Sequence, residues 1–486
     1  MKKKYLWFIP PAIIIILVVF YTFFFKRVDI SKIDSDLQKL STLFTDSAVD
    51  IAQTIDEGLE VEYMIEEIKT EYSKSVRHNK IPMSINENGI AENRLAICIS
   101  NVLSKNLTHP NGHLYFTSPY QTFYPFLSYV VFGSDILFEK SGSEYRVYSS
   151  NDDRIKQGML YTGSTENLYK TIADGKELYR FGVFSNEYLK TAKISVEEND
   201  YEIKLTYNPG TIEPVENLSY TNDDGTLYVN FNTCSWHTEA EQNRIFDVIA
   251  ELAAIIKEGS TNLIVFDLRN NTGGFSSVSY SLFGALVCGT TDDMSNVFEE
   301  YIHYYDYLHS DQICINTKAS RSRLSLQGYG DDNLTKILLT KTDEKYPVVY
   351  APEEEPKKEL APVYKGKILL ITDIYTASAA EDFILLVKTA FPDNTIIVGQ
   401  NTRGALDYAT VFQFKLPDSK LSFQISMVDN TKTPLLKNST TWHGDTKGCY
   451  PDYWFMFNGD FDVEDCIDIA SGPSTGSGTT LVDSTR

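Results

Sequence analysis

The sequence predicts an α/β protein whose core is built from βαβ units, preceded by a transmembrane helix, a helical segment and a small β-rich module. Three short apolar runs, rich in β-branched residues and bounded by turn residues, are typical of strands covered on both faces. These runs span residues 263–266, 368–371 and 395–398. Helical patterns at 277–287 and 379–391 alternate with the runs, which indicates βαβ crossovers.

The helix expected just before the first run has both of its ends marked in the sequence. Thr238-Glu-Ala-Glu241 is a capping box, and Gly259 follows the last apolar residue of the helical pattern. Later in the chain, Leu416-Pro-Asp-Ser-Lys-Leu421 predicts a hairpin turn between strands at 411–415 and 422–428.

The amino terminus predicts a membrane anchor. Residues 5–25 carry no charge and follow Lys2, Lys3 and Lys4. A helix of this length rises about 32 Å, enough to cross a hydrocarbon core. A cleaved signal peptide is the alternative, but no small-x-small cleavage pattern follows the run, which favours an uncleaved signal anchor. The lysines slightly favour a cytosolic amino terminus, so we expect a single-pass protein of the cell membrane with its bulk outside the cytosol.

The remaining chain divides into four predicted parts. Apolar residues at helical spacing (Ile33, Leu37, Leu40, Phe44) indicate that residues 28–112, which follow the anchor at 1–27, are helical. The tyrosine-rich stretch 113–222 predicts a β-rich module with one helix near 166–174, either a PDZ-like domain or an ordinary β spacer. The α/β domain spans 223–470, with a charged insertion at 290–366, and a disordered Gly/Ser/Thr-rich tail follows at 471–486.

Composition excludes some classes of function. A net charge of −22 argues against a nucleic-acid partner, because phosphates require a basic surface. The six cysteines are spread singly without a CxxC pair, so a zinc site built on cysteine is not expected. We expect them to be buried small hydrophobes, and we expect no metal or cofactor.

Two short blocks about a hundred residues apart predict the halves of one hydrolytic site. Ser378 leaves a strand and opens a helix, where free backbone N–H groups can meet a developing negative charge. Gly273 and Gly274 end the loop after the first apolar run and can bring further N–H groups to the same point. The alternative is structural, because Ser378-Ala-Ala-Glu381 is also a capping box. Small residues around Ser378 leave room for a substrate carbonyl and favour the nucleophile.

These blocks resemble the serine peptidase family of tail-specific (C-terminal processing) proteases, tricorn protease and the interphotoreceptor retinoid-binding protein repeats. The resemblance covers roughly residues 226–455 and a fragment near 113, and it is strongest at 267–274, 376–381 and 399–404. It implies a ClpP/crotonase-like α/β core. It also implies that Ser378 is the nucleophile and that the N–H of Ala379 forms the oxyanion hole with that of Gly273 or Gly274.

Members of this family differ in their catalytic base. Processing proteases carry a lysine where this chain has Ala405, and Lys388 lies about 15 Å along the helix axis from Ser378, too far to replace it. Tricorn-like members use a histidine in a turn before a strand, and Asn111-Gly-His-Leu-Tyr-Phe116 resembles that motif. The resemblance therefore implies His113 as the base, with His109 as the nearest competitor. The other histidines lie in weaker contexts: His237, His303, His309 and His443.

The third catalytic residue implied by the resemblance is Asp445. Tricorn-like members carry a glutamate six residues before a Pro-Asp pair, and Asp445 has that spacing to Pro451-Asp452. An aspartate is one methylene shorter, and Asp445 could equally be a polar residue of a turn. The chain also departs from the tricorn-like pattern at Gly112, where those members carry a serine.

Together these features predict a membrane-anchored extracytoplasmic serine endopeptidase that cleaves peptides or proteins through an acyl-enzyme. The alternative is a catalytically inactive member that binds peptides or apolar ligands, as the retinoid-binding relatives do. An ordinary α/β-hydrolase is not favoured, because no serine lies in a Gly-x-Ser-x-Gly motif. The oligomeric state and the cleavage preference stay open.

Overall fold

The computed structural model of the protein describes most of the chain in ten segments. These are residues 25–26, 33–76, 81–82, 91–118, 121–207, 218–290, 296–326, 344–349, 362–455 and 465–467. The predicted anchor at 5–25, apart from Phe25, and the predicted tail at 471–486 lie outside the described residues. In the described part of the chain, no helix is both long and apolar enough to cross a membrane.

The chain forms two compact units, and each is assembled from separate stretches of sequence. Unit 1 contains residues 1–126, 313–349 and 408–429, and unit 2 contains residues 127–312, 350–407 and 430–486. The predicted domain boundaries stay a prediction.

The core of unit 2 is a six-stranded sheet in the order β11-β12-β13-β15-β16-β21. Its strands are β11 (Leu218–Asp223), β12 (Thr226–Phe231), β13 (Leu263–Asp267), β15 (Lys367–Thr372), β16 (Thr395–Gly399) and β21 (Tyr453–Trp454). β11 pairs antiparallel with β12, and every later pair is parallel. The three apolar runs are therefore confirmed as parallel strands, and the α/β class of the core is confirmed.

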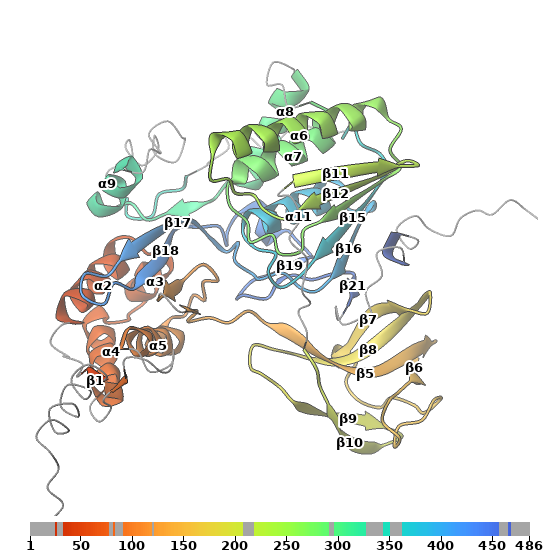
Figure 1. The fold of residues 1–486 in the computed structure, drawn as a ribbon, viewed down its shortest axis with the longest axis horizontal. Coiled ribbons are helices and arrows are strands. Elements are labelled where there is room, and N and C mark those ends of the chain that lie inside the picture. Colours follow the sequence, from red (N-terminus) through yellow and green to blue (C-terminus); the bar gives the residue numbers. More distant parts are fainter. Residues whose placement is uncertain are drawn as a thin grey trace, which may run out of the picture. The chain divides into compact units, whose positions relative to one another are not determined.

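Helices cover one face of this sheet: α6 (Glu239–Glu258), α7 (Ser276–Cys288) and α11 (Ala379–Ala390) (Figure 1). Alternate strand residues such as Ile264 and Leu370 pack against them, while Val265 and Leu369 face a second cluster with Phe455. Side chains on a strand alternate between its faces, so strands covered on both faces become apolar at every position. Thr238 caps α6 and Gly259 ends it at φ 76°, as predicted.

Four further elements of the α/β part of unit 2 are described. They are α8 (Asn296–Leu308), α12 (Pro434–Lys437), β19 (Trp442–His443) and β20 (Gly448–Cys449).

The β-rich part of unit 2 consists of two antiparallel sheets. The larger has the order β6-β5-β8-β7, from β5 (Val130–Ser141), β6 (Glu144–Ser149), β7 (Leu168–Ala173) and β8 (Lys176–Ser185). The smaller pairs β9 (Thr191–Val196) with β10 (Asn199–Lys204). The helix predicted near 166–174 is wrong, because the helical part is only the 3-10 turn Thr165–Asn167 and β7 follows it. Tyrosine, threonine and isoleucine favour the strand, and Asp174-Gly175 turns it into β8.

Unit 1 combines helices with a five-stranded sheet. Its helices are α2 (Asp34–Asp46), α3 (Val49–Asp56), α4 (Val61–Val76), α5 (Ala91–Asn106) and α9 (Lys318–Leu326). The sheet runs β14-β18-β3-β4 and β17 pairs with β18; its strands are β3 (Tyr115–Thr117), β4 (Thr122–Phe123), β14 (Ile313–Cys314), β17 (Tyr408–Lys415) and β18 (Ser422–Asp429). β1 (Phe25–Lys26) pairs with β2 (Ile81–Pro82). The antiparallel pairing of β17 with β18 confirms the predicted hairpin, and all six cysteines of the chain are buried.

Candidate active site

Ser378 lies in unit 2 between β15 and α11, in a backbone conformation that is unusual for serine. Its φ is 56° and its ψ is −121°, and α11 begins at the next residue. A non-glycine residue at positive φ costs roughly 1–3 kcal/mol and persists only where its surroundings hold it. Ser378 is the N-cap residue of α11 and forms a capping box with Glu381. Its side chain is half-buried.

Glu381 holds the backbone around Ser378. This fully buried carboxylate accepts a hydrogen bond from the Ser378 N–H (2.8 Å). It also accepts from the Thr402 hydroxyl (2.6 Å), the Gly404 N–H (2.6 Å) and the Ala405 N–H (2.9 Å). Burial raises the pKa of Glu381, and the four hydrogen bonds oppose that rise. The sequence identified Glu381 only as a helix cap, because its other donors lie more than twenty residues away.

A second buried carboxylate joins the serine loop to the first loop. Asp373 accepts hydrogen bonds from the N–H groups of Tyr375 and Thr376 and, across to the other loop, from that of Asn270 (3.0 Å). Burial raises the pKa of Asp373 to about 6. The Ala377 N–H donates to the Asn271 carbonyl at 2.9 Å, which adds a second link between the loops. The two predicted halves of the site are thus adjacent at the carboxyl ends of β13 and β15.

The two glycines of the first loop differ in what their N–H groups do. Gly273 approaches the serine closely, since a Cβ on it would lie 2.7 Å from the Cβ of Ser378 and 3.0 Å from the nitrogen of Ala379. Its own N–H donates to the side-chain oxygen of Asn271 (3.0 Å). Gly274 has φ 141° and is exposed. Among the described residues, the N–H groups of Gly274 and Ala379 find no acceptor. Gly273 is thus the glycine that lies against Ser378, while Gly274 is the one whose N–H is uncommitted among the described residues.

Asp445 lies in a turn of unit 2 with φ 58°, and its side chain is exposed. Its backbone N–H donates to the buried carboxyl of Asp407 (3.1 Å), which also accepts from the Trp442 indole (2.9 Å). Burial, and to a lesser degree repulsion from Glu381, raises the pKa of Asp407 to about 7. Within the described structure, no hydrogen bond reaches the Asp445 carboxylate. The sequence did not identify Asp407, which has no local motif.

His113 lies in unit 1, in a turn just before β3, as the motif predicts. Its Nδ1 lies 2.6 Å from the carbonyl oxygen of Tyr408. A carbonyl only accepts, so Nδ1 carries the proton, and a neutral ring of this tautomer would use Nε2 as the base. The backbone of His113 is held as well, with its N–H on the side-chain oxygen of Asn111 (2.8 Å) and its carbonyl on Gln424 Nε2 (2.9 Å).

Other basic groups are engaged differently. His109 Nε2 lies 2.9 Å from Glu57 Oε1. Both ring nitrogens of His309 face acceptors, the Tyr305 carbonyl (2.9 Å) and Asp382 Oδ1 (2.8 Å). Although burial opposes it, the Asp382 carboxylate raises the pKa of His309, which favours the protonated ring and disfavours a role as base. Lys388 Nζ donates to the Thr395 carbonyl (2.8 Å) and pairs with Asp452. Ala405 is buried against Glu381.

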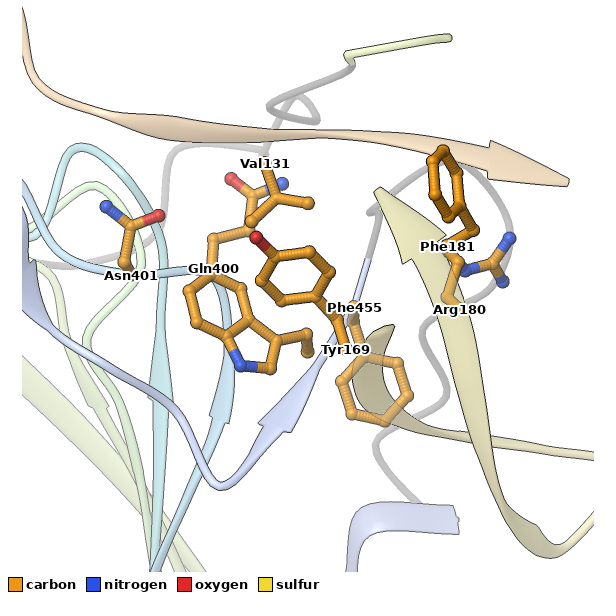
Figure 2. Close-up of a pocket in the computed structure, with 8 residues that line it drawn as sticks. Val131, Tyr169, Arg180, Phe181, Gln400, Asn401 and Phe455 are labelled. Atoms are coloured by element: carbon orange, nitrogen blue, oxygen red, sulfur yellow. The ribbon is translucent and has the colours of Figure 1, made fainter. Parts of the chain in front are cut away.

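A small cavity lies behind the loop that follows β16. It is lined by Val131, Tyr169, Arg180, Phe181, Gln400, Asn401, Trp454 and Phe455 (Figure 2). A water-sized sphere can occupy about 20 Å³ of it, room for roughly one water molecule and not for a peptide. This cavity is therefore not the substrate site. In the part of the chain that the structure describes, no group of three or more His, Cys, Asp or Glu residues is arranged to hold a metal ion.

Comparisons with known proteins agree with the resemblance seen in the sequence. The model of peptidase family S41 matches residues 225–454, which include Gly273, Gly274, Ser378, Ala379 and Asp445. A comparison with curated protein sequences found no match.

Solved structures of several peptidases align with most of the chain at low similarity. Mature CPAF is 14% identical at a TM-score of 0.37, covering 82% of this chain and 89% of its own. The photosystem II D1 C-terminal processing protease is 12% identical at 0.34, covering 90% and 98%. The tricorn protease is 15% identical at 0.32, covering 87% and 34%. At these TM-scores the likenesses place no residue and assign no role in this chain.

Proposed function

We propose that Ser378, His113 and Asp445 carry the reaction of this chain, a serine peptidase whose residues 225–454 match peptidase family S41. The observation that carries the proposal is the setting of Ser378. It is held at positive φ at the start of α11, Gly273 lies against it, and the N–H groups of Ala379 and Gly274 have no acceptor among the described residues. Donors fixed in advance around a serine are what acyl transfer requires.

In the proposed mechanism, Nε2 of His113 takes the hydroxyl proton of Ser378 while Oγ attacks the carbonyl carbon of a peptide bond. The N–H groups of Ala379 and Gly274 hold the resulting oxyanion. His113 then gives the proton to the leaving amine, the C–N bond breaks, and an acyl-enzyme remains on Ser378. Water, deprotonated by the same histidine, releases the acid.

Asp445 has a supporting role in this proposal. The orientation of the imidazole is supported by the Tyr408 carbonyl, which already accepts from Nδ1. Asp445 is exposed, so we expect it to stabilise the imidazolium across solvent, with a smaller effect than a buried partner would have.

Labelling with a fluorophosphonate tests the nucleophile. We expect one modified residue, Ser378, and no labelling in Ser378→Ala. Ser277→Ala is the matched control, because this exposed serine lies in the first turn of α7, close in sequence to the glycine loop, and its loss should leave labelling unchanged. A properly folded protein that resists the probe would instead favour the binding-module alternative.

We also propose that residues 5–25 anchor the protein in the cell membrane with the peptidase outside the cytosol. The support is the uncharged run and the lysines before it. A shortened protein that begins near Val28 should be soluble without detergent, whereas the full chain should fractionate with membranes. Membrane partition of the shortened chain would mean that a further segment binds lipid.

A further inference from the structure

A buried hydrogen-bond network lies behind the backbone of His113 in unit 1. The fully buried Asn111 accepts the His113 N–H through its side-chain oxygen (2.8 Å). Its Nδ2 donates to Asp50 Oδ2 (3.1 Å) and to the Ser426 hydroxyl (3.2 Å). The amide thus uses its oxygen and both of its protons on three different elements: the turn of His113, helix α3 and strand β18.

Asp50 and the His113 N–H together fix which way this amide points. A backbone N–H only donates, and an ionised carboxylate only accepts, whereas the Ser426 hydroxyl can do either. With Asp50 ionised, Asn111 turns its nitrogen toward Asp50 and its oxygen toward His113. An amide at position 50 could donate as well as accept, so it would remove one of the two constraints on this orientation.

Asp50 occupies its position at a cost to stability. Its side chain is fully buried, and among the described residues its Oδ1 has no hydrogen-bond partner. Burial raises the pKa of Asp50 to about 6; the Asn111 hydrogen bond, the backbone N–H groups of Ile51 and Asp50 itself and the nearby His109 lower it only in part. A buried carboxyl that is only half satisfied is expensive and is more often retained for a function than for stability.

Helix α3 is fixed to the strands that hold His113. Gln53, one turn after Asp50, donates to Asp429 at the end of β18 (2.8 Å). β18 also provides Gln424, which donates to the His113 carbonyl, and its partner β17 begins with Tyr408, which accepts from Nδ1. The helix, both strands and the histidine therefore form one hydrogen-bonded assembly within unit 1.

We propose that Asp50, acting through Asn111, is a positioning residue for His113. The N-terminal helices would then help to hold the catalytic base in place. This inference rests on the proposed role of His113. Neither Asp50 nor Asn111 touches the substrate. Their effect is to fix the turn that sets the direction of the imidazole.

The test is a double-mutant cycle with Asp50→Asn and Asn111→Ala, scored by kcat, KM and the pH dependence of kcat/KM. We expect each single variant to lower kcat on the order of tenfold, because small misplacements of a reacting group are costly, with KM changed less than about twofold. Because Asp50 acts through Asn111, Asp50→Asn should have no further effect once Asn111 is alanine. Thr54→Val on the same buried face of α3 is the control and should keep wild-type kcat.

Thermal melting separates positioning from a structural role. The folded pKa of Asp50 lies above its ordinary value, so ionisation weakens the folded state as pH rises from about 4 to about 6. Asp50→Asn should therefore melt no lower than wild type above pH 6, and this advantage should vanish below pH 4. A variant that is at least as stable yet slower cannot owe its loss to unfolding. If Asp50→Asn folds poorly at pH 7, the pKa argument is wrong and the proposal fails.

The same measurements distinguish a failure of the positioning role of Asp50 from a failure of the proposed role of His113 as base. Wild-type kcat in Asp50→Asn, or additive losses in the double variant, would overturn the positioning role while an inactive His113→Asn upholds the base. An active His113→Asn would overturn the base itself, and the positioning role with it.

Discussion

The surroundings of Ser378 in unit 2 and of His113 in unit 1 each contain a buried carboxylate. The two carboxylates differ in how many hydrogen bonds they accept. Glu381 behind the serine accepts four hydrogen bonds. Asp50 behind the histidine accepts one side-chain hydrogen bond from Asn111 and leaves an oxygen unpartnered among the described residues. Burial raises the pKa of both carboxyls, so the difference between them lies in their donors: four groups donate to Glu381, whereas one side chain donates to Asp50.

The largest effect should come from Ser378→Ala. Activity should fall about 10⁴- to 10⁶-fold, because only binding and the oxyanion donors remain. The unfolding free energy should fall by no more than about 2 kcal/mol, because the loss of an N-cap residue typically costs about 0.5–2 kcal/mol. Peptide hydrolysis and urea denaturation on the same preparation measure both. Substantial activity in this variant would remove Ser378 from the site.

Replacement of the base should come next. His113→Asn should abolish hydrolysis, and wild-type kcat/KM should rise with pH through one apparent pKa in the region of about 6–7, as neutral imidazole forms. His109→Asn is the matched control, four residues earlier and paired with Glu57, and should stay active. If the outcomes are exchanged, the wrong histidine was chosen, although the serine–histidine class would stand.

The same acid-to-amide change should have opposite effects on stability in the two regions. Glu381→Gln places an NH₂ group against donors that need an acceptor, so we expect a loss of about 2–4 kcal/mol of unfolding free energy at pH 8. Asp50→Asn should be neutral or stabilising by about 1–3 kcal/mol at that pH, because it removes a buried ionisation. Chemical denaturation compares them directly. A change in unfolding free energy of the same sign in both variants would contradict this contrast between the two regions.

The smallest effect expected is that of Asp445→Asn. Its carboxylate is exposed, so kcat should fall by only about two- to tenfold, since screened charges interact weakly in water. Added salt should reduce the wild-type rate toward that of the variant. Complete inactivation by this substitution would show that Asp445 acts as a direct hydrogen-bond partner of the base.

The elements that the sequence predicted well are those marked by local patterns. The apolar runs of β13, β15 and β16 identify a doubly covered sheet without knowledge of its partners, and Thr238 and Gly259 mark the ends of α6. The predicted helix near 166–174 fails, because β7 is defined by its pairing with β8 and not by its own periodicity. Strand propensity depends on such context more than helix propensity does.

The site was predictable only in part for the same reason. Ser378 and the glycine loop carry motifs that can be read in the sequence. The tertiary partners of Glu381 and Asn111, and the Tyr408 carbonyl that fixes the tautomer of His113, come from residues 21 to 315 positions away. Backbone acceptors leave no sequence signal at all. Nothing in the local sequence marks Asp50 as a buried residue, because its burial arises only from tertiary packing.

The central claim is that Ser378 and His113 act on one substrate carbonyl, and a peptidyl chloromethyl ketone tests it most directly. Such a reagent forms a hemiketal with the serine hydroxyl and alkylates the histidine that serves as its base, with loss of chloride. Mass spectrometry of the inactivated protein should show alkylation of His113 alone, and Ser378→Ala should abolish it. Alkylation of another histidine, or of His113 at an undiminished rate in Ser378→Ala, would contradict the account.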